Sequence, residues 1–140
     1  MDLQKIRFFR NTRSTYCVKH GIYLEELRTG YARVIKTITA DDLNPLHYAH
    51  GGVYYAVADT ACGSAVISHG QMVVTVSGSY NYFRSAKEGD TIICEAREVK
   101  HGKTICVSEC TITDQNGILL GNGNFTFYQL EESVPDLEME

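Results

Sequence analysis

Residues 50–68 read HGGVYYAVADTACGSAVIS, and this stretch decides how the chain folds. From Gly52 to Ser68 small and apolar side chains occupy every direction around a helix, which is typical of a helix buried on all sides. At roughly 1.5 Å per residue, this helix would be about 25 Å long, the width of a small domain. Its many small residues indicate that other backbone comes close, as when a sheet wraps around a helix.

The segments on either side of this helix alternate with the period of strands. We expect a short helix at 3–10 and strands at 21–27, 31–39, 72–83, 91–99, 104–113 and 119–130, separated by turns at 29–30, 88–90, 101–102 and 116–117. Successive strands joined by short turns pair antiparallel. The sequence therefore predicts an α+β protein in which an antiparallel sheet of about six strands wraps around one long central helix, the layout called the hotdog fold.

The length and charge of the chain limit its organisation and its partners. We expect one domain at 1–130 and a flexible acidic tail at 131–140, where a proline and five acids disfavour packing. The net charge of −4 argues against binding to nucleic acid or an anionic membrane. The N-terminus lacks a signal-peptide pattern, and no stretch approaches the roughly 20 apolar residues that span a bilayer. We therefore expect a cytoplasmic protein.

The cysteines and histidines show no metal-binding pattern. Five cysteines are present, an odd number without a C-x-x-C pair, at positions 17, 62, 94, 106 and 110. This spacing predicts reduced, mostly buried thiols rather than disulfides or a zinc site. His47 and His50 have no acidic or thiol ligand at a suitable spacing, so we expect no metal ion.

Asp59 is the acid that interrupts the apolar helix. An ionised carboxylate loses hydration in such surroundings, which costs several kcal/mol unless a partner or a function compensates. Two interpretations stay open at this point. The acid is either structural, satisfied by neighbouring hydroxyls or an arginine, or reactive, with a pKa raised by burial.

The segment His50-Gly51-Gly52 opens this helix. The first amides of a helix lack internal partners and carry partial positive charge, so they can stabilise an oxyanion. His50 and Asp59 are nine residues apart, about 13 Å and half a turn around a helix. One chain therefore cannot bring both to one carbonyl. A two-fold dimer with antiparallel central helices would set Gly51 of one chain near Asp59 of the other, in two equivalent sites.

The run from Leu43 to Ala61, LNPLHYAHGGVYYAVADTA, resembles the signature of the PaaI-like acyl-CoA thioesterases of the hotdog superfamily. An asparagine stands six residues before a histidine, and an aspartate stands nine residues after it. The resemblance implies that Asp59 is the general base or nucleophile and that the Gly51 amide polarises the thioester carbonyl. It implies that Asn44 and His50 orient the thioester and support the loop, while Thr75 positions the attacking water.

The resemblance also extends to the region that would contact CoA. It implies CoA contacts at Tyr82 and at the turn formed by His101, Gly102, Lys103 and Thr104. It implies no separate cofactor, because CoA is part of the substrate.

The roles of three residues near these sites stay open. Ser77, two residues after Thr75, competes with it for the water-positioning role. His47 and Tyr48 occupy a loop where the family often has a glycine and a small residue, and they either reshape the acyl pocket or lie at an interface and in solvent.

The resemblance therefore implies a thioesterase that hydrolyses an acyl-CoA to free acid and CoA. We expect it to self-associate as a homodimer or as a homotetramer built from two dimers, with shared sites. Two alternatives are a non-catalytic acyl-CoA-binding module and a hotdog enoyl-CoA hydratase. The hydratase would pair an acid with a histidine in one catalytic segment, which the nine-residue separation disfavours.

Overall fold

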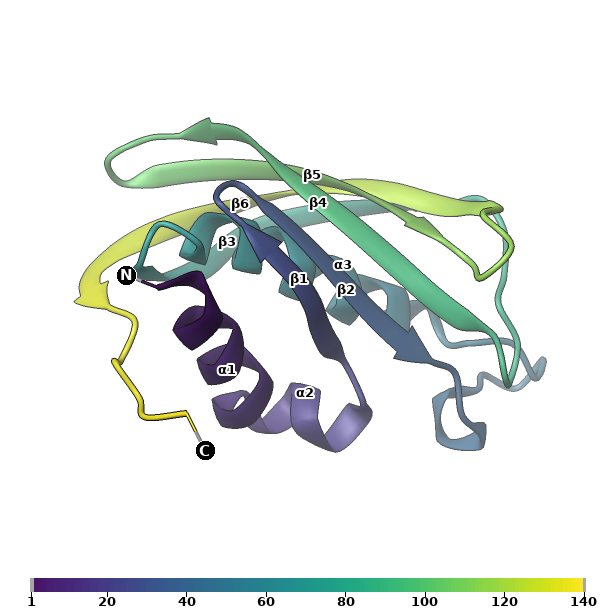
Figure 1. The fold of residues 1–140 in the computed structure, drawn as a ribbon. Coiled ribbons are helices and arrows are strands. Elements are labelled where there is room, and N and C mark those ends of the chain that lie inside the picture. Colours follow the sequence, from purple (N-terminus) through teal and green to yellow (C-terminus); the bar gives the residue numbers. More distant parts are fainter. Residues whose placement is uncertain (1, 140) are drawn as a thin grey trace.

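The computed structural model describes residues 2–139. At its centre lies helix α3, Gly51–Ile67, and one curved antiparallel sheet of six strands lies over it (Figure 1). The strands are β1 Tyr23–Arg28, β2 Tyr31–Thr37, β3 Gln71–Tyr82, β4 Thr91–His101, β5 Ile105–Thr113 and β6 Leu119–Ser133. The α+β hotdog layout predicted from the sequence is confirmed.

The strand order is β1-β2-β4-β5-β6-β3, so β3 and β4 are not neighbours in the sheet although they follow each other along the chain. The hairpins β1–β2 and β5–β6 turn at Gly30 and Gly117, whose φ angles of 75° and 78° lie in the left-handed region that glycine adopts readily. By contrast, β3 pairs with β6 at the far edge of the sheet and not with β4. Among the described residues, 2–139, the outer edge of β3 is therefore unpaired, and Val74 and Val76 on it are 50% and 58% exposed.

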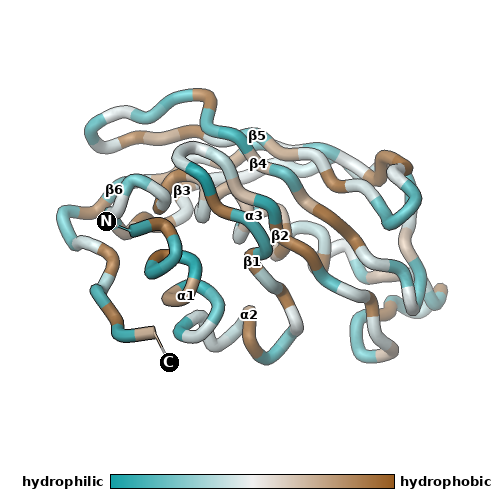
Figure 2. Tube along the Cα trace, in the orientation of Figure 1, coloured by the Kyte–Doolittle hydropathy of each residue, from teal (hydrophilic) through white to brown (hydrophobic). Residues whose placement is uncertain are grey.

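Alternation along the strands turns apolar residues toward α3. Ile92, Cys94 and Ala96 of β4 are fully buried, and the strand becomes hydrophilic toward its end (Figure 2). Residues 61–67 of α3 are all buried, as the sequence predicts. Burial on all sides is wrong for the first half of α3, where Gly52, Tyr55, Ala56 and Asp59 form a stripe that the sheet leaves uncovered. Their spacing of three and four residues puts them on one face of the helix.

Two short helices precede the sheet. Helix α1, Leu3–Arg13, agrees with the expected helix at 3–10, whereas helix α2, Thr15–His20, was not predicted. Arg10 of α1 donates hydrogen bonds to the Thr60 carbonyl at 3.2 Å and to Ser64 Oγ at 3.2 Å. These contacts tie α1 to the middle of α3.

The C-terminal segment beyond residue 130 begins with the last residues of a strand. Strand β6 continues to Ser133, and Val134 is 2% exposed with its N–H bonded to the Gly70 carbonyl at 2.9 Å. Lys5 and Asp136 form an exposed ion pair at 2.7 Å, which joins the two ends of the chain. All five cysteines are unpaired and buried, as predicted. Within residues 2–139, no helix combines the length and hydropathy needed to cross a membrane.

Candidate active site

Asn44 organises the loop that leads into α3. Its Oδ1 accepts hydrogen bonds from the backbone N–H groups of Leu46 at 2.9 Å and Tyr48 at 3.1 Å, while its own N–H donates to the Tyr48 carbonyl at 2.7 Å. His47 lies inside this turn with φ of 66°, the left-handed conformation that suits glycine. The resemblance implies a glycine at this position. His47 stands there instead and is held in a conformation that is strained for a residue other than glycine.

The start of α3 presents one free amide. His50 is the N-cap, and its Nδ1 accepts from the Gly52 N–H at 2.8 Å. Within residues 2–139 the Gly51 N–H has no acceptor. Tyr82 donates its hydroxyl to the Gly51 carbonyl at 2.8 Å, which holds the following peptide, Gly51–Gly52, and burial raises the pKa of Tyr82. The helix start therefore offers the Gly51 N–H as a free donor.

A buried ion pair that the sequence analysis missed supports this loop. Lys36 Nζ lies 3.1 Å from Asp42 Oδ2, and their side chains are 4% and 7% exposed. Asp42 also accepts from the N–H and hydroxyl of Thr39 at 2.8 and 3.1 Å, and its carbonyl accepts from the His50 N–H at 2.8 Å. Burial opposes ionisation, but the Thr39 and Lys36 contacts outweigh it and lower the pKa of Asp42. Thr39-x-x-Asp42 has the capping-box spacing, a signal that could have found this residue.

Asp59 and Thr75 meet on the uncovered face of α3. Thr75 Oγ1 donates to Asp59 Oδ1 at 2.8 Å, and Asp59 is half-buried. The pairing of β3 with β6 shifts between Thr75 and Ser77, so the intervening residue forms a bulge. A bulge interrupts the alternation of faces, so Ser77 does not share the face of Thr75. The structure brings Thr75, and not Ser77, to the acid.

The candidate residues fall into two groups within one chain. Gly51 and Asp59 are eight residues apart on α3, about 12 Å along its axis. Tyr82 contacts Gly51 at the start of the helix. His69 lies two residues after the end of the helix, and the His101 ring packs against its ring with centroids 3.8 Å apart. The expected CoA contacts at Tyr82 and at the turn 101–104 therefore lie at opposite ends of α3.

The turn 101–104 has a constrained backbone. The Gly102 N–H donates to the Ile105 carbonyl at 3.0 Å, and a Cβ at Gly102 would lie 2.6 Å from that same oxygen. The carbonyls of Lys103 and Thr104 accept hydrogen bonds from Gln129. The Lys103 side chain is exposed. This turn presents a cation at the surface of an acidic protein.

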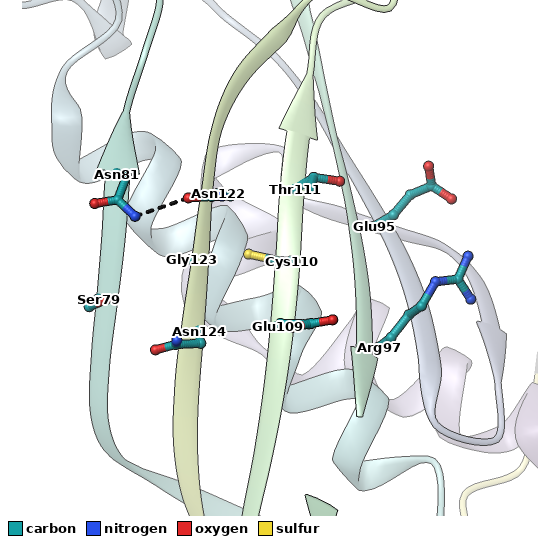
Figure 3. Close-up of a pocket in the computed structure, with 10 residues that line it drawn as sticks. All are labelled: Ser79, Asn81, Glu95, Arg97, Glu109, Cys110, Thr111, Asn122, Gly123 and Asn124. Atoms are coloured by element: carbon teal, nitrogen blue, oxygen red, sulfur yellow. Dashed lines mark hydrogen bonds between the residues drawn. The ribbon is translucent and has the colours of Figure 1, made fainter. Parts of the chain in front are cut away.

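Two hollows differ in where they lie relative to these groups. One, of about 380 Å³, lies beside the start of α3 and includes His50, Gly52, Val53 and Ala56, with Tyr16 and His20 from α2. The other, of about 470 Å³, lies on the outer face of the sheet and contains none of the expected site residues (Figure 3). Its side chains come from β3, β4, β5 and β6, and Asn81 donates to Asn122 at 3.0 Å across it. Only the first hollow adjoins the Gly51 peptide.

Comparison with known proteins finds the same architecture elsewhere. The family model described as the thioesterase superfamily matches residues 46–120. The acyl-coenzyme A thioesterase PaaI of Escherichia coli is 33% identical over 95 residues, covering 68% of this chain and 68% of that protein. The solved E. coli PaaI structure superposes with a TM-score of 0.83 at 24% identity, covering 94% of this chain and 99% of that one.

A hypothetical thioesterase protein of Streptococcus pneumoniae, solved with coenzyme A, is also similar. It is 30% identical with a TM-score of 0.76, covering 80% of this chain and 88% of that one. Two further structures of that protein carry alanine in place of an aspartate and of a threonine that are 16 positions apart. Asp59 and Thr75 are separated by the same 16 positions.

Proposed function

Since the chain belongs to the thioesterase superfamily, as a PaaI-like thioester hydrolase with the hotdog fold, we propose that it cleaves an acyl-CoA to the free acid and CoA. The observation that carries this proposal is the 2.8 Å hydrogen bond from Thr75 to Asp59 on the face of α3 that the sheet leaves open. It places a carboxylate and a hydroxyl together where a substrate can reach them.

Two routes use these groups. As a general base, Asp59 takes a proton from water while the water oxygen bonds to the thioester carbon, and the C–S bond then breaks to release the CoA thiolate. As a nucleophile, an Asp59 oxygen bonds to that carbon, the C–S bond breaks to release the CoA thiolate, and water then hydrolyses the resulting anhydride to the free acid and the Asp59 carboxylate. On either route the Gly51 N–H stabilises the oxyanion, Thr75 orients the water or the carboxylate, and Asn44 and His50 hold the loop.

We propose that two chains form each site, in a homodimer or a dimer of dimers. Gly51 and Asp59 are too far apart in one chain to act on one carbonyl. The uncovered stripe on α3 and the unpaired edge of β3 are adjacent, because Thr75 of β3 contacts Asp59 of α3. Antiparallel pairing of two such faces would also bring Tyr82 of one chain toward the turn 101–104 of the other. That arrangement unites the two groups of expected CoA contacts.

The hollow beside the start of α3 is our candidate for the acyl group. It adjoins His50 and Gly52 and combines apolar residues with the ring pair Tyr16 and His20, whose centroids are 4.4 Å apart. Free-thiol release from short, medium, long and aromatic acyl-CoAs will rank the substrates that fit it.

The first test compares wild type with Asp59→Asn in this free-thiol assay. Loss of a general base typically costs about 10²- to 10⁴-fold, so turnover should fall at least about a hundredfold while CoA binding persists. Asp136→Asn, which changes an exposed aspartate in the C-terminal segment, serves as the matched control. Unchanged turnover in Asp59→Asn would contradict the assigned role.

The same assay separates the two alternative functions. An acyl-CoA-binding module would bind ligand without releasing thiol. An enoyl-CoA hydratase would consume enoyl absorbance without releasing thiol. Either result with wild-type protein would replace the proposed function.

The shared site has its own test, which uses Gly51→Pro. Proline is tolerated at the first helical position and removes only the N–H, and His50 already has the extended conformation that a following proline requires, with φ −60° and ψ 141°. Gly51→Pro should lose about 10²- to 10³-fold in kcat, whereas Gly51→Ala keeps the donor. Equal mixing of Gly51→Pro with Asp59→Asn should restore about a quarter of wild-type activity, because half of the dimers are hybrids with one intact site. No recovery after proven subunit exchange would place the site within one chain.

A further inference from the structure

His69, Glu98 and His101 form a cluster of ligating side chains away from Asp59. His69 Nε2 lies 2.7 Å from Glu98 Oε1, and His101 Nδ1 lies 2.6 Å from Glu98 Oε2. One ligand atom from each residue lies within 4.8 Å of the others. We propose that this cluster binds a divalent transition-metal ion of the zinc class.

The backbone brings these three residues together by a specific irregularity. Glu98 and His101 are three apart on β4, a spacing that points to opposite faces in a regular strand. The register between β4 and β5 shifts between Glu98 and Lys100, so Val99 forms a bulge that returns His101 to the face of Glu98. Bulges commonly redirect a side chain beside a functional site.

The third ligand is held by the loop that ends α3. His69 follows Ser68, whose Oγ accepts from the Gly30 N–H at 2.8 Å, while the Gly30 carbonyl accepts from the Glu98 N–H at 2.9 Å. The β1–β2 turn therefore ties the His69 loop and β4 together. Gly30 leaves room for the carboxylate, since a Cβ there would lie 3.0 Å from Glu98 Oε1.

The donor set selects the class of ion. Two imidazoles and one carboxylate are the protein ligands of many zinc sites that keep a fourth position open, whereas calcium and magnesium prefer oxygen ligands. Solvent can supply the fourth ligand, because the side chains of His69, Glu98 and His101 are 32%, 12% and 27% exposed.

The present contacts are hydrogen bonds, and a bound ion would replace them. With bonds of about 2.0–2.2 Å in tetrahedral geometry, ligand atoms lie about 3.3–3.5 Å apart. The contacts of Glu98 with His69 at 2.7 Å and with His101 at 2.6 Å must therefore each open by less than about 1 Å. Each imidazole would then carry its proton on the other ring nitrogen. A divalent ion would also offset the negative charge of the Glu98 carboxylate.

This site is separate from the proposed catalytic residues. His69 follows Asp59 by ten residues, about 15 Å along α3 and its continuation. An ion bound here would fix the end of α3 to β4 and would engage His101, the residue that the family resemblance assigns to CoA.

The test titrates metal-free protein with zinc chloride in competition with a chromophoric chelator, and repeats the titration with magnesium chloride. We expect one zinc ion per chain, no binding of magnesium at the same concentrations, and a rise in Tm with zinc. Loss of an outer-shell partner weakens metal sites about 10- to 100-fold, so the ligand variants Glu98→Gln and His69→Asn should weaken zinc binding by more than this. His20→Asn, which changes a histidine outside the cluster, should bind zinc as wild type does.

The protein also has five buried thiols, a second kind of metal ligand. Cobalt spectra distinguish these thiols from the histidine and carboxylate ligands. Cobalt should give absorption bands that disappear in the Glu98→Gln and His69→Asn variants, with circular dichroism confirming that both remain folded. Should one variant fail to fold, the other decides. Absence of zinc binding by wild type, or affinity unchanged in a folded variant, would overturn the proposal. A thiolate-to-cobalt band that persists in the variants would overturn it as well.

Discussion

Lys36→Met removes the cation from the buried pair that supports the loop before α3. The variant keeps the apolar length of the side chain but leaves the Asp42 carboxylate, 7% exposed, without its counter-charge. Breaking a buried pair in this way costs about 3–5 kcal/mol. Because Thr39 still donates two hydrogen bonds to Asp42, we expect the lower end, about 3 kcal/mol.

This loss is large enough to measure directly. With an unfolding entropy of about 2.1 cal/mol/K per residue, a chain of 140 residues should lose about 10 °C in Tm. Urea unfolding followed by circular dichroism at pH 7 gives the free energy, and calorimetry gives Tm. Lys19→Met, an exposed lysine on α2, is the matched control and should change stability little.

The pH dependence gives the same interaction a second signature. The pKa of Asp42 is lowered in the folded state, so its contribution to stability is present above its unfolded pKa of about 3.9 and is lost as the pH falls through the folded value. The difference between wild type and Lys36→Met should therefore shrink in acid. A difference below about 1 kcal/mol at pH 7, the scale of an exposed pair, would refute the reasoning.

Three further variants test other contacts. Thr75→Val should lower kcat about tenfold, because it removes a hydrogen bond to the Asp59 carboxylate worth about 1.5 kcal/mol. Thr75→Ser keeps the hydroxyl and should retain activity. Equal kcat values for Thr75→Val and wild type would contradict the role. Tyr54→Phe should cost about 1–3 kcal/mol in urea unfolding, since it leaves a buried backbone N–H unpaired, and Tyr55→Phe on the uncovered face should not. Gly102→Ala should cost about 1–3 kcal/mol, because its Cβ meets a backbone oxygen at 2.6 Å, and wild-type stability would show that the turn relaxes.

Local patterns in the sequence were enough to predict the layers of the fold. The alternating strands, the turn glycines and the apolar run at 52–68 each report on their own segment, and the corresponding elements lie where expected within a few residues. The position of β3 was not predictable in this way, because the choice between β4 and β6 as its neighbour depends on how the whole sheet closes around α3.

The candidate site was predictable only in part for a related reason. Asp59 stands out as an acid in an apolar helix, but the choice of Thr75 over Ser77 as its partner depends on a bulge in β3 that the alternation does not reveal. Lys36 reads as an ordinary polar residue, and His69 and Glu98 are 29 positions apart. Such pairs form only when separate elements pack, so spacing along the chain carries little information about them.

If the proposed dimer forms through the unpaired edge of β3, the working state of the protein depends on its concentration. Twelve residues of strand with exposed valines form a template on which another strand can add. If a second copy occupies this edge, dilution below the dissociation constant would expose it again and remove catalysis at the same time. A nascent or diluted chain would then depend on rapid assembly, since the same edge that completes an enzyme also seeds aggregation when the wrong strand binds.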